Sequence, residues 1–449
     1  MPMDEPVALL LLAANMIVLG GAGAVLLSRR PAVAMFVVLL APCVPAAMTP
    51  NALEGETEPG RLGGYVRVSL VMLGGGAGLV AWLGAGRRRQ GRVPGQYILL
   101  AVFLAWAMAS TLRSAAPFYT LVRAVTFVGL GCFMLGLHVW GADERGLEGI
   151  LGALFAAVAV WIVANAAMSL LWPAKAWWWN APARLQGLSN HPNSMGSFCA
   201  MSYPVILWRL SRSRGPARAG LMALIGVVAV MQLLSGSRTS LLCAGVGVGA
   251  YFLAAGRPRA LAGLAATGAL AGIVLLASPP ASLRRRVTDD TAVNLTGRPE
   301  IWRAGWYLVE ERPVEGFGYD AETKVLQDPA YQRTARVRFS VTARQSMHNG
   351  YLSVLAGTGV VGLAIWLAVL ALPYVKAWRV DARDRKALAI GIMSMGLVAN
   401  LVESQITPAA SLTAAMFWVA WALAGRLAAG VGPRPAPPLR TGTGGEVAT

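Results

Sequence analysis

The chain alternates long apolar runs with short polar connections. A helix needs roughly 20 apolar residues to cross the hydrocarbon of a bilayer. Runs of about that length lie at residues 7–27, 33–49, 65–84, 97–112, 118–140, 150–172, 193–210, 220–235, 239–256, 260–278, 349–375, 387–406 and 410–428. This pattern predicts an all-α polytopic integral membrane protein of about 12–13 transmembrane helices. Pro42, Pro45 and Pro50 make the second run the least regular, and the glycines at 74–78 predict close packing of the third run against a neighbouring helix.

One connection is much longer than the others and is rich in Arg. It occupies residues 279–347, where Trp302 and Trp306 are four residues apart and therefore share one face of a helix. We expect a short helix there, lying on the membrane surface. The chain then divides into N-terminal transmembrane helices at 1–278, this loop at 279–347, C-terminal transmembrane helices at 348–428 and a disordered, Pro- and Gly-rich tail at 429–449.

Basic residues gather in connections that alternate along the chain. These clusters lie at residues 29–30, 87–92, 209–218, 257–259 and 376–386. Short loops rich in Lys and Arg stay in the cytoplasm, so these connections and the tail are predicted to be cytoplasmic. The loop at 279–347, the connection at 172–190 and the corner at 235–240 are then predicted to share the outer face.

The composition and charge distribution argue against a nucleic-acid-binding function. The chain is 56% hydrophobic and 13% charged, whereas soluble proteins have about 25% charged residues. Its net charge of +18 would suggest nucleic-acid binding if the basic residues formed one face. Because most of them sit in short clusters between apolar runs, we expect membrane lipids and no nucleic acid as partners. The four cysteines lie in apolar runs without metal-site spacing, so we expect neither a metal nor a cofactor.

Several arginines on the predicted outer face are candidates for anion binding. Arg238 lies in a corner with Ser235, Gly236 and Ser237, whose hydroxyl and N–H groups can point at an anion. A role in which its side chain only reaches to the membrane interface stays equally open. Arg298 supplies a second guanidinium at the start of the expected loop helix.

Histidine is the side chain best suited to accept a proton near neutral pH. His348, at the entrance to the run at 349–375, is our candidate base, although a histidine there can also be a simple cap. His191 precedes Pro192, and we interpret it as a turn residue. Asn400 lies inside the run at 387–406, and Glu403 lies toward its outer end, where it could be functional or form a helix-end hydrogen bond.

The polar motifs, taken in order, resemble those of one family. They are Gly236-Ser-Arg238, Thr296-Gly-Arg298-x-x-x-Trp302, Pro313-x-x-Gly-x-Gly318, and His348-Asn-Gly-Tyr-Leu352 leading into Gly357-Thr-Gly-Val-Val-Gly-Leu363. This combination resembles the O-antigen ligase family, whose superfamily also includes O-antigen and exopolysaccharide polymerases and bacterial O-oligosaccharyltransferases. The resemblance covers residues 183–421.

The resemblance implies a multi-pass glycosyltransferase of the bacterial inner membrane, with its active site in a periplasmic loop at 279–347. Such enzymes take a glycan from an undecaprenyl diphosphate carrier. Carried over by motif, Arg238 and Arg298 would bind the diphosphate, Arg184 would belong to the same substrate-binding site, and His348 would take a proton from an acceptor hydroxyl. The implied reaction is a metal-independent single displacement with inversion at the sugar C1.

The predicted topology departs from that of the family in one respect. Family members are usually drawn with twelve spans and a cytoplasmic N-terminus. Here Asp4 and Glu5 precede the first run and Arg29-Arg30 follow it, which predicts an uncleaved span that enters from the outside. The loop at 279–347 is on the outer face in both arrangements.

Three functions remain open at this stage. A ligase would pass a finished glycan to lipid A-core or another acceptor, and a polymerase would add repeat units to a growing polysaccharide. The third is a transporter or flippase for a lipid-linked sugar. Transporters place ionisable groups near the bilayer midplane on broken helices, whereas this sequence concentrates them in outer loops. Transport is therefore the least favoured of the three.

Overall fold

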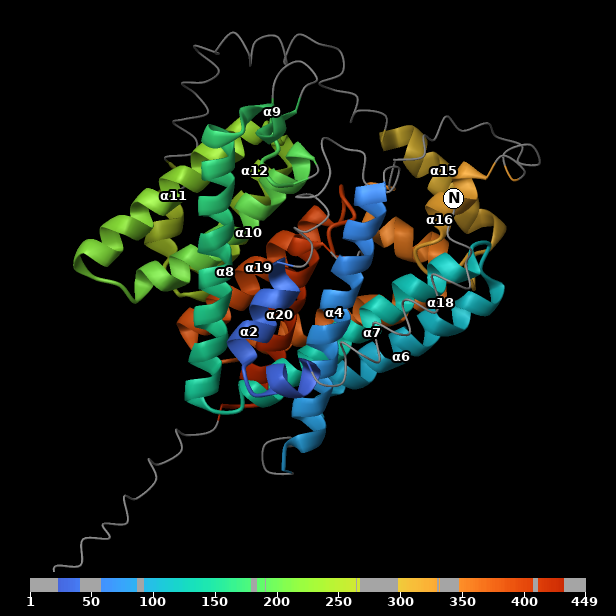
Figure 1. Cartoon of the computed structure of the whole chain (residues 1–449), viewed down its shortest axis with the longest axis horizontal. Helices are drawn as coiled ribbons and strands as arrows, with labels where there is room; N and C mark the ends of the chain where they lie inside the picture. Colours follow the sequence, from blue (N-terminus) through green and yellow to red (C-terminus); the bar gives the residue numbers. More distant parts are fainter. Residues whose placement is uncertain are drawn as a thin grey trace, which may run out of the picture.

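The computed structural model describes residues 23–40, 58–86, 93–178, 184–189, 191–263, 265–266, 298–328, 331, 347–406 and 411–431. These residues form a bundle of helices with one two-residue hairpin (Figure 1). The elements are α2 (Pro31–Leu40), α4 (Glu58–Gly84), α6 (Gly95–Ala109), η1 (Ser110–Arg113), α7 (Pro117–Trp140), α8 (Glu144–Leu171), α9 (Pro173–Ala176), β1 (Trp177–Trp178), β2 (Arg184–Leu185), α10 (Pro192–Ser211), α11 (Gly215–Ser235), α12 (Arg238–Ala254), α15 (Arg298–Glu311), α16 (Glu322–Gln327), α18 (Gly350–Trp378), α19 (Arg383–Ala399) and α20 (Leu412–Ala428).

The helices confirm the predicted class of all-α polytopic membrane protein. In the described part of the chain, six helices are long and apolar enough to cross a membrane, and α2, α12 and α20 are shorter apolar helices. The six are found within α4, α6 with η1, α7, α8, α11 and α18. More than half of each predicted run at 7–27, 33–49 and 260–278 lies outside the described residues, so the full number of spans stays a prediction.

One predicted run ends earlier than its hydrophobicity suggested. Helix α19 ends at Ala399, with Asn400 as its C-cap, so Asn400 is not inside a span and Glu403 lies in the turn beyond. The carbonyl of Asn400 accepts a hydrogen bond from Gly350 N at 2.8 Å, and its side-chain oxygen accepts one from Ile406 N at 3.3 Å. These bonds satisfy polar groups of the turn that follows the end of α19. They also hold the turn that carries Glu403.

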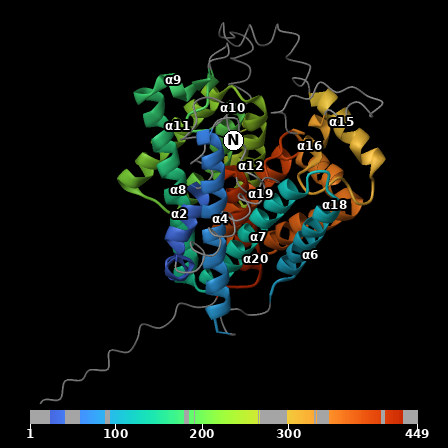
Figure 2. The same cartoon turned by 45° about the vertical axis from the view of Figure 1, so that its right-hand side comes forward.

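Aromatic side chains pack the centre of the bundle. Trp366 of α18 lies 4.8 Å from Phe103 of α6 and 5.4 Å from Trp418 of α20, measured between ring centroids. Phe127 of α7 completes the group at 5.1 Å from Trp418. All four side chains are fully buried. Figures 1 and 2 show α19 and α20 inside the bundle, where α20 is buried along nearly its whole length.

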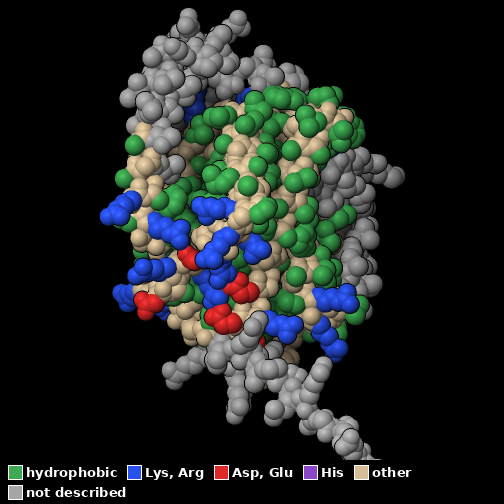
Figure 3. Space-filling view, turned by 90° about the vertical axis from the view of Figure 1, so that its left-hand side faces the viewer, with side chains coloured by type: hydrophobic (Ala, Val, Ile, Leu, Met, Phe, Trp, Pro, Cys, Tyr) green, Lys and Arg blue, Asp and Glu red, His purple; other side chains and the backbone are tan. Residues whose placement is uncertain are grey.

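Three of the connections predicted to be cytoplasmic, those at 209–218, 257–259 and 376–386, meet at one end of the bundle. Arg385 and Arg212 both bond Glu148, at 2.8 and 2.6 Å, and Arg257 lies 3.8 Å from Asp384. In Figure 3, Lys and Arg side chains gather on the lower part of one face, below an apolar region. Helices α9 and α15 lie at the other end (Figure 1). These basic connections and the helices α9 and α15 thus lie at opposite ends of the bundle, as the alternation of basic connections along the sequence predicts.

A discontinuity in α18 binds part of the segment at 279–347. Gly359 has a φ of 70° and interrupts the helix, which leaves backbone groups of α18 open to other partners. Phe317 N and Gly318 N donate to the carbonyls of Ala356 and Gly357 at 3.0 and 2.8 Å, and Val360 N donates to Pro313 O at 2.8 Å. The Pro-x-x-Gly-x-Gly turn is therefore hydrogen-bonded to α18 by backbone groups.

Two acidic residues follow this turn, and one of them attaches it to α7. Asp320, whose φ is 62°, forms an ion pair with Arg123 of α7. Glu322 is 2% exposed, and its Oε2 has no hydrogen-bond partner among the described residues. Burial, together with the negative charge of Asp320, raises the pKa of Glu322 to about 8. The folded protein therefore favours a neutral carboxylic acid at this position.

Helices α4 and α7 approach so closely that their backbones touch, as the glycines at 74–78 predicted. A Cβ on Gly75 would lie 2.3 Å from the carbonyl oxygen of Gly129, and one on Gly78 would lie 2.3 Å from that of Cys132. Nothing lies within 4 Å of the corresponding position on Gly152 of α8.

We expect Gly75→Ala to separate these helices and to lower the stability of the protein by about 1–3 kcal/mol, because the added methyl group overpacks the contact. Gly152→Ala is the matched control, and its higher helix propensity should leave stability unchanged or slightly increased. Thermal unfolding in detergent measures both. Equal melting temperatures for the two variants would contradict the close contact.

We also expect Glu322 to make stability depend on pH. Since its folded-state pKa exceeds its ordinary value of 4.5, its contribution should be lost as pH rises from about 4.5 to about 8. Glu322→Gln imitates the neutral acid and should unfold at a higher temperature than wild type at about pH 9. Glu300→Gln, on the exposed side of α15, controls for the change in net charge. A Glu322→Gln profile that parallels the wild-type profile would contradict the neutral acid.

Candidate active site

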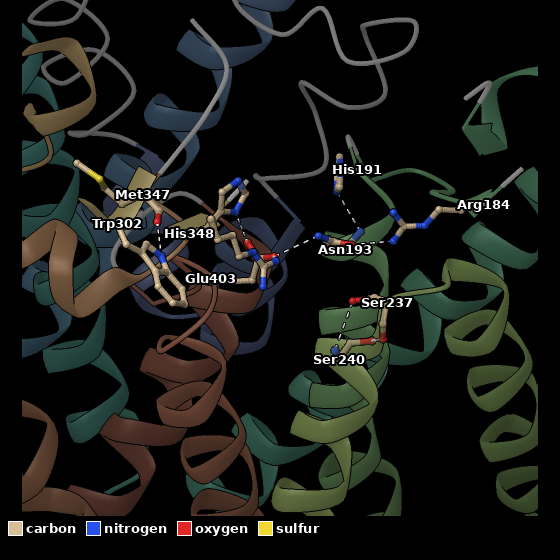
Figure 4. A network of polar contacts seen from close by, with 10 residues as sticks. Arg184, His191, Asn193, Ser237, Ser240, Trp302, Met347, His348 and Glu403 are labelled. Carbon is tan, nitrogen blue, oxygen red and sulfur yellow. Dashed lines mark hydrogen bonds and ion pairs between the residues drawn. The ribbon is translucent and has the colours of Figure 1, made fainter. Parts of the chain in front are cut away.

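Glu403 joins polar side chains from three parts of the chain. Its Oε2 lies 2.8 Å from His348 Nδ1, and its Oε1 accepts hydrogen bonds from Arg298 Nη2 at 2.5 Å and Asn193 Nδ2 at 3.1 Å. The carboxylate side chain is only 9% exposed. Figure 4 shows these contacts as a continuous line across the ends of several helices.

The loop helix α15 carries Arg298 at its first position, in agreement with the helix predicted around Trp302 and Trp306. Buried residues on one side of α15 pack against α16 and α18 and hold it in place. Arg298 is itself 8% exposed. A guanidinium at such a depth requires a partner, since an unpaired buried charge is costly. Glu403 supplies that partner.

Several local contacts fix the position of His348. Its backbone is left-handed, with a φ of 46°, a conformation that non-glycine residues adopt only when their surroundings hold it. Met347 O accepts a hydrogen bond from Trp302 Nε1 at 3.0 Å, and Asn349 caps α18 by accepting from the N–H groups of Tyr351 and Leu352. The residues on both sides of His348 are therefore anchored, and its imidazole is directed at Glu403.

Arg184 and Asn193 extend the network toward α11 and α12. Arg184 Nη2 donates to Asn193 Oδ1 at 2.7 Å, and its Nε donates to Ser235 O at the same distance. Ser235 belongs to the corner that continues through the left-handed Gly236 to Arg238 at the start of α12. Arg238 is exposed on this corner. The structure therefore brings Arg184, Arg298 and His348 into one network, and it places Arg238 beside that network.

His191 caps the N-terminus of α10, next to Asn193. Its Nδ1 accepts a hydrogen bond from Asn193 N at 3.1 Å, and its ring packs edge-on to Trp178 of β1, with centroids 5.3 Å apart. Burial, aided by the positive charge of Arg184, lowers the pKa of His191 to about 4. The residue expected only to form a turn is thus a neutral imidazole within the polar site.

The electrostatics of the site favour an anion. Burial raises the pKa of Glu403, but its hydrogen bond to His348 and the charges of His348 and Arg298 outweigh burial, so the net pKa shift is downward. Glu403 is therefore ionised and paired with Arg298, and Asn193 links it to the guanidinium of Arg184. Among the residues that the structure describes, no group of three or more His, Cys, Asp and Glu side chains is arranged to hold a metal ion.

Two members of the network were not assigned to the site from the sequence. The sequence leaves open whether Glu403 is functional or forms a helix-end hydrogen bond, and it indicates no role for Asn193. The one available signal was a carboxylate at the outer end of an apolar run, which identifies Glu403 as unusual without naming its partners. Those partners, His348 and Arg298, lie 55 and 105 residues away in the chain.

We expect Glu403 to stabilise the protein above its ordinary pKa of 4.5 and to lose this effect as pH falls through its lower folded-state pKa. Glu403→Ala should cost about 3–5 kcal/mol at pH 6, because the buried Arg298 would lose its partner. Glu403→Gln should be less harmful and should flatten the acid limb of a thermal-unfolding profile. Glu300→Gln removes one negative charge at an exposed position of α15, so an equal response of both variants would point to net charge rather than to the network.

Comparison with known proteins agrees with the resemblance seen in the sequence. Residues 221–367 match the family model described as O-antigen ligase. An O-antigen ligase from Pseudomonas aeruginosa is 28% identical over 263 residues, and the match covers 55% of this chain and 57% of that protein. The chain thus aligns with little more than half of that relative's length. No solved structure matches the chain. The matched segment at 221–367 contains Arg238, Arg298 and His348.

Proposed function

We propose that this protein is a membrane glycosyltransferase. It would move a glycan from an undecaprenyl diphosphate carrier to a hydroxyl group of an acceptor at the periplasmic face of the inner membrane. The observation that carries the proposal is the bridge formed by Glu403, which places a histidine at 2.8 Å and an arginine at 2.5 Å on the two oxygens of one buried carboxylate. A proton acceptor and an anion-binding group are thereby held side by side.

The contact with Glu403 makes His348 suited to act as the base. An ionised carboxylate only accepts hydrogen bonds, so His348 Nδ1 carries the proton in this contact. In the neutral imidazole, Nε2 is then the nitrogen that can take a proton from an acceptor hydroxyl. The negative charge of Glu403 also stabilises the imidazolium that forms.

The arginines are suited to the leaving group. Cleavage of the bond between the sugar C1 and the diphosphate oxygen leaves negative charge on the diphosphate. Planar guanidiniums bind such oxygens with two parallel hydrogen bonds and keep their charge at any physiological pH. Arg298 and Arg184 are oriented by the network, and Arg238 lies at the N-terminal end of α12, where the helix dipole also favours an anion.

The reaction then follows as one displacement. The acceptor oxygen attacks C1, His348 takes the hydroxyl proton, and the C1–O bond breaks with its electron pair remaining on the diphosphate. Attack from the face opposite the leaving group inverts the configuration at C1. Positive charge from the arginines takes the place of a divalent cation, so the proposed reaction is metal-independent.

The acceptor distinguishes two forms of this activity. The name of the Pseudomonas relative, O-antigen ligase, favours transfer of a finished glycan to lipid A-core over polymerisation of repeat units. Transport of a lipid-linked sugar is less favoured, because the network lies at the ends of helices. Arg298 begins α15, Asn193 is at the start of α10, and Glu403 follows α19.

We expect His348→Gln to reduce transfer from undecaprenyl diphosphate glycan by about 10²–10⁴-fold, because the general base is lost. Arg298→Lys should reduce it by about 10²–10³-fold, because a point charge does not reproduce the bidentate fork. Purified protein in detergent, assayed with EDTA and a hydroxyl acceptor, measures both, and product length separates a ligase from a polymerase.

Arg212→Lys is the matched control, since Arg212 forms an ion pair with Glu148 at the other end of the bundle. It should transfer glycan at the wild-type rate. Near-normal transfer by the inserted His348→Gln variant would overturn the assignment of the base. Loss of wild-type transfer in EDTA would overturn the metal-independent mechanism.

A further inference from the structure

The two histidines of the site are hydrogen-bonded in opposite senses. His348 Nδ1 faces a carboxylate oxygen of Glu403, at 2.8 Å. His191 Nδ1 instead accepts a hydrogen bond from the backbone N–H of Asn193, at 3.1 Å. The ring proton of neutral His191 is therefore on Nε2. Where His348 presents Nε2 as a proton acceptor, His191 presents Nε2–H as a hydrogen-bond donor.

His191 is held as a donor over the physiological range of pH. Its pKa of about 4 follows first from burial and then from the charge of Arg184, with Glu403 acting in the opposite direction and His348 and Arg298 adding to the decrease. A group with this pKa is neutral above about pH 5 and is a poor base for a sugar hydroxyl. The edge-on contact with Trp178 and the capping bond restrict the ring on two sides.

The position of His191 associates this donor with the arginines. Asn193, which His191 caps, itself joins Arg184 to Glu403. In Figure 4 the imidazoles of His191 and His348 lie on the same side of the line of contacts that runs from Glu403 to Arg184. A substrate that reaches His348 on this side and touches Arg184 would pass His191. The two substrates proposed above are the diphosphate carrier and the hydroxyl acceptor. The oxygens of the diphosphate are the ones that need hydrogen-bond donors.

We propose that His191 is a further substrate-binding residue, whose Nε2–H donates a hydrogen bond to an oxygen of the carrier's diphosphate. This inference rests on the function proposed above. The residue contributes a directional bond without adding another positive charge to a site that already gathers guanidiniums. His191 donates from the part of the network that contains Asn193 and Arg184, whereas His348 contacts Glu403.

The substitution His191→Asn separates this role from helix capping. Asparagine is a good N-cap whose side-chain oxygen can accept the same backbone N–H, but it has no donor at the position of Nε2. His191→Ala removes both the cap and the donor. Binding to the purified full-length protein in detergent is measured at neutral pH and fixed ionic strength for undecaprenyl diphosphate and for undecaprenol, which lacks the diphosphate. Melting temperatures are recorded for each variant.

We expect His191→Asn and His191→Ala each to weaken undecaprenyl diphosphate binding by about 10–100-fold, as for loss of a hydrogen bond to a charged group, while undecaprenol binding is unchanged. Normal diphosphate binding by His191→Asn would overturn the inference and leave His191 as a cap. Equal losses for both lipids would overturn it as well. A wild-type protein that does not prefer the diphosphate over undecaprenol would instead overturn the proposed function, and this inference with it.

Discussion

The contacts of the buried Glu403 carboxylate are the interactions on which the polar site of this protein depends. A carboxylate at 9% exposure is stable as an ion only when hydrogen bonds and positive charges replace water. Arg298, His348 and Asn193 provide them, and each comes from a different segment. The same contacts bring together the start of α15, the entrance to α18 and the start of α10. The contacts that compensate the charge of Glu403 are therefore the same contacts that assemble the site.

Backbone complementarity holds the loop that carries Arg298. A continuous helix has no unpaired groups to offer along its length, so the interruption of α18 at Gly359 is needed before the turn from Pro313 to Gly318 can bond to it. The ion pair of Asp320 with Arg123 adds an attachment to α7. A polar loop is thus joined to the apolar bundle by directional bonds, which position a side chain more accurately than apolar contact alone.

Hydrogen-bond sense gives chemically identical side chains different properties. His348 faces a carboxylate and can take a proton at Nε2, whereas His191 faces an amide N–H and keeps its proton there. Neither property belongs to the residue type. Both follow from which group lies beside Nδ1, and that group is set by where α10 begins and where the turn after α19 ends. The site gains an acceptor and a donor from two imidazoles within one network.

The sequence by itself determined the fold class, the alternation of basic connections and the packing of glycines between α4 and α7, because these depend on hydrophobicity and side-chain size along local stretches. It also marked Arg184, Arg298, Arg238 and His348 as polar residues on one face. Only the tertiary structure decided that Glu403 unites Arg184, Arg298 and His348, since hydrogen bonds between residues 55 and 105 positions apart leave no periodic pattern in the chain. It likewise decided that α19 ends at Ala399, where long-range bonds to the turn outweigh an apolar sequence that favoured a longer helix.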